Sequence, residues 1–373
     1  MIIKLGKVIS EYSVRNKADE DIPVYSVTND KGFCTNYFSK DVSSKDRTTY
    51  KIVPYGYFAY NPSRINVGSV DWQHYEKKVI VSPLYVVFYV DEVIDQRYLL
   101  HYLKSDITLK FIKSNSAGSV RDNLKLSVLQ EFSINLRTKE EQYKIVNILD
   151  KVDLLISLYT EKLEKFDELT KSLFIEMFGD PVKNPFMFEK QRLSKIGELE
   201  RGVSKHRPRN APELLGGKYP LIQTGEISNS DLYINKFENT YSELGLSQSK
   251  LWKKGTLCIT IAANIAKTGI LTFDSCFPDS VVGFVPNKLT NNIFIHYWFS
   301  FFQKILEEEA PESAQKNINL KVLSKLDVIV PPIELQNKFA AVVAQIDKSK
   351  LAVKKSLEEL EILKKSLMQK YFA

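Results

Sequence analysis

The chain has 373 residues, of which 44% are hydrophobic and 26% charged, and these proportions indicate a folded globular protein of about two domains rather than a disordered chain. Its net charge of +7 permits binding to a polyanion such as nucleic acid but does not demand it. Three cysteines without paired spacing argue against a disulfide framework or a zinc site and favour a reducing cytoplasm, and no segment has the pattern of a secretory signal or a membrane span.

The first block, residues 1–138, is expected to form a mixed α and β domain. Runs rich in β-branched and aromatic residues predict strands at 79–82 and 84–90, and an apolar pattern predicts a short helix at 96–104. Residues 1–140 carry a net charge of +4.

The second element, within residues 139–185, is predicted to be one long helix. Its apolar residues alternate four and three apart, which is the seam of a coiled coil. The segment Gly179-Asp180-Pro181 is expected to end the helix, and residues 141–185 carry a net charge of −3. The seam residues are Ile145, Leu149, Val152, Ile156, Tyr159, Leu163 and Phe166.

A second mixed domain, residues 186–332, and a second long helix, residues 333–373, complete the chain. Strands are predicted at 256–261 and 270–273, a short helix is predicted at 292–306, and residues 186–330 carry +3. Lys350 takes one position of the second helix's seam. The other seam residues are Phe339, Val343, Ile346, Val353, Leu357 and Leu360.

The chain contains an internal duplication. When the sequence is shifted by 194 residues, residues 119–178 align with 313–372 without a gap, and 16 of the 60 pairs are identical. Two amphipathic helices in separate cores remain an alternative for the helices alone, but they would not explain a match that runs from a loop into a strand and then a helix. The simplest partner for each helix seam is therefore the other helix.

Common catalytic signatures are missing from the sequence. There is no Gly-x-x-x-x-Gly-Lys phosphate loop, no Gly-rich cofactor loop and no Asn-Pro-Pro-aromatic motif of amino-methyltransferases. The nearest match, Asn61-Pro62-Ser63-Arg64, lacks the second proline and the aromatic residue. The four histidines are not at metal-ligand spacing. We therefore predict a chain that is not an enzyme and holds no cofactor of its own.

A duplicated variable block followed by a long helix, without catalytic residues, resembles the specificity subunits of type I restriction-modification systems. Residues 53–69 are similar to a segment common in their target-recognition domains. Residues 223–227, 255–269 and 331–336 are similar to family segments in the second half. One departure is that Leu136-Arg137-Thr138 precedes the first long helix where the family has a double proline, and we expect this to loosen the junction.

The resemblance implies an α+β fold, with two target-recognition domains separated by two long helices that pack as an antiparallel coiled coil about a pseudo-twofold axis. Each domain would read one part of a bipartite DNA target, and the helices would dock one adenine methyltransferase subunit per half. S-adenosylmethionine would belong to those subunits, and ATP and Mg²⁺ to restriction subunits that can join the complex.

Candidate DNA contacts are basic, amide and hydroxyl side chains in predicted loops, because such groups bind base edges and phosphates. The basic run 205–209 could equally be a solvated loop, and Asn123 and Asn317 could equally cap turns. In the first block the candidates are Tyr60, Asn61, Arg64, Asn66 and Arg121. In the second block they are Lys205, His206, Arg207, Arg209, Asn264, Lys267, Gln315 and Lys316.

Two other classes of protein stay open at this point. One is a free-standing DNA-binding or architectural protein that uses two domains on a coiled-coil spacer without any methyltransferase. The other is an enzyme with an unrecognised site. The charge of −3 on residues 141–185 favours a helix surface that meets protein rather than phosphate, which supports the partnered reading over the free-standing one.

Overall fold

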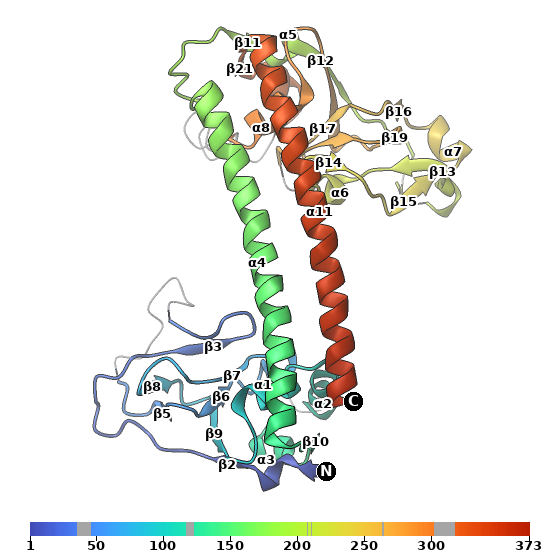
Figure 1. The fold of residues 1–373 in the computed structure, drawn as a ribbon. Coiled ribbons are helices and arrows are strands. Elements are labelled where there is room, and N and C mark those ends of the chain that lie inside the picture. The colour runs from blue at the N-terminus through green and yellow to red at the C-terminus, as the bar shows by residue number, and fades with distance from the viewer. Residues whose placement is uncertain (36–45, 117–122, 207, 210, 263–264, 302–317) are drawn as a thin grey trace. The chain divides into compact units, whose positions relative to one another are not determined.

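The computed structural model describes residues 1–35, 46–116, 123–206, 208–209, 211–262, 265–301 and 318–373, which fall into two compact units (Figure 1). Unit 1 comprises Met1–Lys162 and Val353–Ala373, and unit 2 comprises Leu163–Ala352. Each unit contains one mixed α and β domain and one half of each long helix. The predicted α+β class with two domains and two long helices is confirmed. None of the described helices has a stretch long and apolar enough to span a bilayer.

Unit 1 is built on a four-stranded antiparallel sheet. Its strand order is β2 (Ile9–Glu11), β9 (Val86–Val90), β6 (Phe58–Tyr60) and β7 (Val70–Trp72). The two-stranded pairs are β3 (Ser26–Thr28) with β4 (Gly32–Cys34), β5 (Lys51–Pro54) with β8 (Lys78–Val81), and β1 (Ile2–Lys4) with β10 (Ser133–Asn135). The short helices are η1 (Leu5–Lys7), η2 (Ile65–Val67), α1 (Gln96–Leu103), α2 (Asp106–Ser116) and α3 (Leu126–Gln130).

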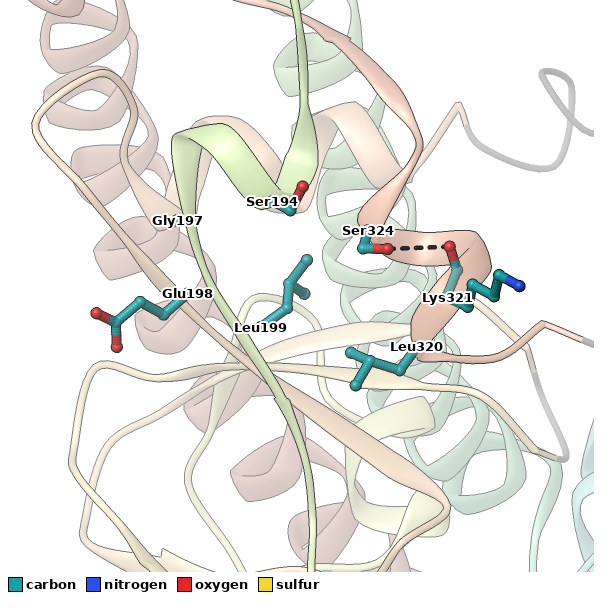
Figure 2. Close-up of a pocket in the computed structure, with 7 residues that line it drawn as sticks. All are labelled: Ser194, Gly197, Glu198, Leu199, Leu320, Lys321 and Ser324. Atoms are coloured by element: carbon teal, nitrogen blue, oxygen red, sulfur yellow. Dashed lines mark hydrogen bonds between the residues drawn. The ribbon is translucent and has the colours of Figure 1, made fainter.

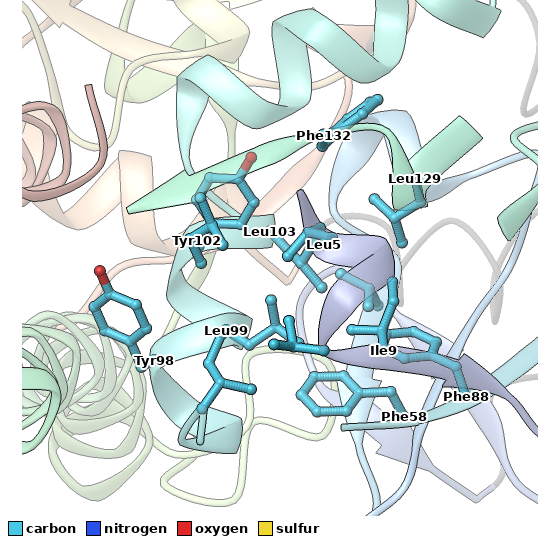
Figure 3. Packing of buried hydrophobic residues seen from close by; sticks show 14 of the residues in the cluster. Leu5, Ile9, Phe58, Phe88, Tyr98, Leu99, Tyr102, Leu103, Leu129 and Phe132 are labelled. Carbon is cyan, nitrogen blue, oxygen red and sulfur yellow. The ribbon is translucent and has the colours of Figure 1, made fainter. Parts of the chain in front are cut away.

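The core of unit 1 joins the sheet to α1 and to the first half of α4 (Lys139–Phe178). Phe58 and Phe88 stack on neighbouring strands with ring centroids 5.0 Å apart, and Leu99 and Leu103 of α1 lie in the same cluster (Figure 3). Burial of such side chains contributes about 1.5–3 kcal/mol each, so this contact fixes the domain on its helix. The α4 residues in this core are Ile145, Val146 and Leu149.

The described strands of unit 2 form two larger sheets and one two-stranded pair. The five-stranded sheet has the order β12 (Gly197–Arg201), β20 (Val281–Pro286), β17 (Leu257–Thr260), β18 (Thr268–Leu271) and β14 (Tyr233–Ile234). The four-stranded sheet has the order β15 (Asn239–Tyr241), β13 (Leu215–Leu221), β19 (Ser275–Cys276) and β16 (Leu251–Trp252), and β11 (Lys190–Arg192) pairs with β21 (Asp327–Ile329). The helices are α5 (Leu193–Ile196), η3 (Pro212–Leu214), α6 (Thr224–Ser228), α7 (Glu243–Ser247), α8 (Asn292–Phe299) and α10 (Leu320–Ser324).

The predicted strands and short helices are found in the structure. The strands expected at 79–82 and 84–90 are β8 and β9, and those expected at 256–261 and 270–273 are β17 and β18. The helix expected at 96–104 is α1. The helix expected at 292–306 begins at Asn292 as predicted but ends at Phe299, where Ser300 caps it and Ser300 and Phe301 form a turn; residues 302–306 lie outside the described part of the chain.

The two long helices, α4 and α11 (Ile333–Phe372), have 40 residues each and pack antiparallel. In unit 1, Lys364 of α11 pairs with Asp153 of α4 at 2.6 Å. In unit 2, Lys350 pairs with Asp167 at 2.6 Å, and the ring of Phe339 lies 5.4 Å from that of Phe178. The partner's number on α11 falls as the number on α4 rises, which confirms the antiparallel coiled coil. All the predicted seam residues are buried or half-buried.

Both ends of α4 are fixed by local hydrogen bonds. Gly179, at φ +75°, donates its N–H to the carbonyl of Ile175 (2.8 Å), so the helix ends where the sequence predicts. At the start, the N–H of Thr138 donates to the Glu141 carboxylate (2.9 Å), and the Glu141 N–H donates to the Thr138 hydroxyl (3.3 Å). This capping box stands where the family has a double proline, and the expected loosening of the junction stays a prediction.

A buried glutamine ties each domain to its long helix, at positions matched by the duplication. In unit 1, Gln142 Oε1 accepts the N–H of Asp95 (2.7 Å), and Nε2 donates to the carbonyls of Val93 (3.0 Å) and Arg137 (2.9 Å). The side chain is 0% exposed, so these groups have no access to water. The carboxamide therefore joins the domain's last strand, α1 and the start of α4.

Unit 2 repeats this arrangement with Gln336. Its Oε1 accepts the N–H of Asn291 (3.2 Å), and its Nε2 donates to the carbonyls of Leu289 (3.0 Å) and Pro331 (2.8 Å). Gln336 is also 0% exposed, and its oxygen accepts a further bond from the Thr290 hydroxyl. The duplication therefore preserves a three-way junction and not only a helix pattern.

Gln336→Ala should lower the free energy of unfolding by about 2–4 kcal/mol, because it leaves buried N–H and carbonyl groups without partners. Gln142→Ala should act equally on unit 1. Gln345→Ala, at an exposed position of α11, is the matched control and should change stability by less than about 0.5 kcal/mol. Thermal and denaturant unfolding measure the effect. Equal stability of Gln336→Ala and the control would contradict the junction.

Lys350 is a polar residue in an otherwise apolar seam. Its side chain is 9% exposed and contacts Asp167 and, at 3.4 Å, Asp231 of the domain. Burial alone would lower the pKa of Lys350, but the hydrogen bond that its ammonium group donates to Asp167 and the charges of both carboxylates raise it above its ordinary value. The ammonium group therefore stays charged and links α11, α4 and the domain of unit 2.

Lys350→Ala should destabilise unit 2 by about 1–2 kcal/mol, less than a fully buried pair, because both aspartates are about half exposed and can be hydrated. Lys350→Met, which keeps the apolar stem, should recover part of this loss. Lys348→Ala, at an exposed position two residues away, is the control. If thermal unfolding gives the same midpoint for all three variants, the buried lysine has no stabilising role.

Candidate nucleic-acid interface

In unit 1, the candidate residues after β6 lie in a tight turn. The carbonyl of Asn61 accepts the N–H groups of Arg64 (3.0 Å) and Ile65 (2.9 Å), and its side-chain oxygen accepts from the N–H (3.1 Å) and hydroxyl (2.9 Å) of Ser63. The Asn61 oxygen is thus used within the turn. Arg64 is exposed and Asn66 is half-buried. The turn therefore offers Arg64 as its main group for a ligand.

Tyr60 is a core residue, and its prediction as a DNA contact conflicts with the structure. The side chain is 0% exposed, and its hydroxyl donates to the carbonyl of Leu124 (3.0 Å). Burial raises the pKa of this hydroxyl well above its usual value. Tyr60 therefore packs in the core next to the turn and has no exposed surface that could contact DNA. Arg121 lies outside the described residues.

In unit 2, the predicted basic loop follows β12. Lys205 and Arg209 are exposed and His206 is half-buried, while Arg207 lies outside the described residues. The guanidinium of Arg209 forms an ion pair with Asp279, on the turn before β20. His206 Nε2 lies 4.0 Å from the Glu213 carboxylate. The loop therefore presents several cations on one side of the domain.

The structure adds basic residues that the sequence analysis missed. Arg201, at the end of β12, donates from Nε to the carbonyl of Asp279. Lys250 pairs with Glu200, and its ammonium nitrogen lies 4.1 Å from the centre of the Trp252 ring. No sequence spacing signals this grouping, because it depends on the pairing of β12 with β20 and on a contact between segments 50 residues apart.

The remaining candidates lie elsewhere in unit 2. Lys267 is exposed in the turn between β17 and β18, where its N–H donates to the Thr260 hydroxyl (3.0 Å) and Ala266 has φ +61°. Asn264, Gln315 and Lys316 lie outside the described residues. Lys267 is therefore available to a ligand, in a hairpin separate from the basic loop.

A pocket of about 700 Å³ lies between β12, α5 and α10 (Figure 2). Its polar side chains do not converge, since Ser324 donates its hydroxyl to the carbonyl of Lys321 (3.0 Å) and Glu198 stands apart on the strand. Such a lining lacks the convergent polar groups of a small-molecule site. The lining residues are Ser194, Gly197, Glu198, Leu199, Leu320, Lys321 and Ser324.

The cysteine thiols and histidine side chains, which could in principle react or bind a metal, are buried or hydrogen-bonded within the fold. Burial raises the pKa of the Cys258 and Cys276 thiols, which disfavours the reactive thiolate. His296 bonds to the Thr268 hydroxyl (2.9 Å), and burial lowers its pKa to about 4, while His101 bonds to Asp150 (2.8 Å). Within the described residues, no group of three or more His, Cys, Asp or Glu side chains could hold a metal ion.

Comparison with known proteins gives a consistent result over both halves of the chain. The chain is 22% identical over 322 residues to the type I restriction enzyme MjaVIII specificity subunit of Methanocaldococcus jannaschii, covering 79% of the chain and 73% of the relative. It is 23% identical over 375 residues to the EcoBI specificity subunit of Escherichia coli, covering 89% and 78%. Among three M. jannaschii relatives the matches span 65%, 73% and 67% of the relative's length, so the chain spans about two thirds of some of them.

A solved structure shares the fold. The crystal structure of a type I restriction-modification system S subunit from M. genitalium superposes with a TM-score of 0.61 at 16% identity, covering 100% of this chain and 96% of that one. The family model for the type I restriction modification DNA specificity domain matches twice, at residues 2–167 and 187–362. Because these two matches take in most of the sequence, the chain belongs to the type I restriction modification DNA specificity domain family.

Proposed function

We propose that this chain is the DNA-recognition subunit of a type I restriction-modification complex and performs no chemistry itself. The observation that carries the proposal is a duplicated junction with unlike loops. Gln142 and Gln336 anchor the two domains in the same way, whereas the hairpins at matching places in the two sheets differ in length and sequence: residues 61–69 join β6 to β7, and residues 261–267 join β17 to β18. Two domains that are attached to the helices in the same way but carry different surface loops suit a DNA target that consists of two different sequences.

Unit 2 illustrates how such a surface would bind DNA. The Asp279 carboxylate holds the guanidinium of Arg209, which keeps its planar donor groups in a limited set of orientations. An oriented guanidinium can donate two hydrogen bonds to a guanine edge, and lysines such as Lys205 suit phosphate oxygens. The proposal assigns one part of a bipartite target to each unit, and Arg64 to the part read by unit 1.

The partner proposed for α4 is an adenine methyltransferase subunit. In unit 1, four large apolar residues of this helix point away from the core, with exposed fractions of 41–59%. Leu155 and Leu158 are three residues apart and Leu154 and Leu158 four apart, so they share a face. A face that is apolar within a segment of net charge −3 suits a protein surface rather than phosphate. We name it the α4 patch: Ile148, Leu154, Leu155 and Leu158.

In this assignment the chain needs no cofactor. S-adenosylmethionine would be bound by the methyltransferase subunits, one per half of the chain, and ATP and Mg²⁺ by restriction subunits if they join. The complex would act on DNA in the cytoplasm. The free-standing alternative differs in one respect, since it requires no methyltransferase to be retained by the helices.

Exchanging residues 186–330 for the matching block of a relative should change one part of the methylated DNA motif and leave the other part unchanged. The reason is that β11 and β21 bracket the block, and Gln336 of α11 can anchor an exchanged domain. Sequencing of methylated adenines in cells with either version measures both parts. A change in both parts, or loss of the bipartite motif, would contradict one domain per part.

Leu155→Asp with Leu158→Asp should abolish copurification of the methyltransferase and the methylation of DNA, because charges would have to be buried in the contact. Ser157→Asp, on another exposed face of the same turn, is the control and should keep both the copurification and the methylation.

The purified chain alone should neither methylate nor cleave DNA with S-adenosylmethionine present. Methylation by the isolated chain, or retention of the partner by the double variant, would count against this assignment.

A further inference from the structure

We propose that Gln248 is the positioning residue of the basic loop and that Lys250 binds DNA phosphate beside it, so that segment 248–250 completes the reading surface of unit 2. This inference rests on the proposed function and extends it. The surface, here named the cationic cluster, gathers residues from β12, from the loop that follows it and from the segment between α7 and β16. Its members are Arg201, Lys205, His206, Arg209, Gln248 and Lys250.

Gln248 shapes the loop through its carboxamide oxygen. Oε1 accepts the N–H of Lys205 (2.8 Å) and the N–H of His206 (3.0 Å), which are consecutive along the chain. Only an acceptor can face two N–H donors, so the oxygen must be the atom that points at the loop. Next to it, the Ser249 hydroxyl donates to the carbonyl of Val203 (2.8 Å). Two residues from a distant segment thus hold the backbone at 203–206.

The Gln248 amide nitrogen supports the same reading. Nε2 is buried and has no hydrogen-bond partner among the described residues. A buried donor without a partner costs free energy. The side chain nevertheless directs its oxygen at the loop. The two hydrogen bonds that the oxygen accepts there are therefore kept even though the amide nitrogen is left without a partner in the described part of the chain. Fixing the loop before DNA arrives reduces the entropy lost on binding.

Ion pairs keep the cations of the cluster in place without cancelling them. Arg201 donates to the backbone carbonyl of Asp279, and Arg209 forms an ion pair with the Asp279 carboxylate. Lys250 forms an ion pair with Glu200. In the described part of the cluster, four lysine and arginine side chains therefore stand against three carboxylates, those of Asp279, Glu200 and Glu213. Lys250 remains 40% exposed, so its ammonium group can reach a phosphate. The remaining positive charge suits a polyanion.

The antiparallel pairing of β12 with β20 supplies a control position. Arg201 lies opposite Val282 at one end, and Gly197 lies opposite Pro286 at the other, roughly 13 Å away at 3.3 Å per residue. Lys288, two residues beyond Pro286, is exposed at that far end. Lys288→Ala therefore removes the same charge from the same domain, away from the cationic cluster.

The test uses the full chain in complex with its methyltransferase and duplex DNA carrying the motif found by methylome sequencing. Each base pair of the part assigned to unit 2 by block exchange is also substituted singly. Gln248→Met, which has similar length and no acceptor, should reduce discrimination against substitutions in that part about tenfold and leave the other part unaffected. Gln248→Glu keeps the acceptor and should keep the motif while weakening affinity at low salt. Gln345→Met, at an exposed position on α11, is the matched control.

Lys250→Ala should lower affinity for matched and mismatched DNA alike, leave the motif unchanged, and reduce the salt dependence of binding by about one unit of slope. Lys288→Ala should change neither. Unaltered discrimination by Gln248→Met, or equal loosening of both parts of the motif, would overturn the positioning role. An unaltered salt slope in Lys250→Ala would overturn the phosphate contact.

A complex of the unchanged chain that recognises no motif would reject the proposed function itself. A motif that is read normally by the Gln248→Met and Lys250→Ala variants would reject only the present inference. Because Lys250→Ala removes an exposed side-chain end, it keeps the test decisive if Gln248→Met proves too unstable to purify.

Discussion

The structure depends on one hydrogen-bonded junction that occurs twice. A buried glutamine in the first turn of each long helix bonds to the segment that enters the domain's helix and to the strand end before its own helix. A carboxamide has one acceptor and one donor group at fixed angles, so both can be satisfied only when the segments meet in one geometry. The apolar core supplies most of the stabilisation, but apolar packing tolerates small shifts of the domain along its helix. The directional hydrogen bonds of the glutamine do not tolerate such shifts.

This junction explains why the loops can differ while the support is shared. Residues at the anchored end of each domain keep matched partners, such as β1 with β10 and β11 with β21. The loops beyond the sheets are held by contacts particular to each unit: Asn61 closes its own turn in unit 1, and in unit 2 Gln248 holds a loop that lies 43 residues earlier in the chain. A recognition protein needs this division, because its binding surfaces must change without altering how they are mounted.

The sequence predicted the elements that have a periodic hydrophobic pattern. It did not predict the positions of side chains that depend on which strands pair in the folded sheets. The long helices follow from a seam repeated over some twenty residues and from Gly179 at the end of the first, and both helices are found. Tyr60 was predicted as a DNA contact because it carries a hydroxyl group in a segment expected to be a loop, yet β6 pairs with β7 and β9 there and the side chain lies in the core. Gln248 and Arg201 escaped notice because their partners lie far along the chain, and only the folded sheets bring them together.

The duplicated helices have diverged in charge in a way that bears on their pairing. Residues 139–178 carry nine acidic residues against six lysines, and residues 333–372 carry eight lysines against five acidic residues. The ion pairs follow this division, with α4 supplying Asp153 and Asp167 and α11 supplying Lys364 and Lys350. In the duplicate alignment, the positions matching Lys350 and Lys364 on α4 are Ile156 and Thr170. Two copies of α4 would therefore set each aspartate against an uncharged residue, so the charges favour the pairing of α4 with α11, most strongly at Lys350, where burial limits screening by salt.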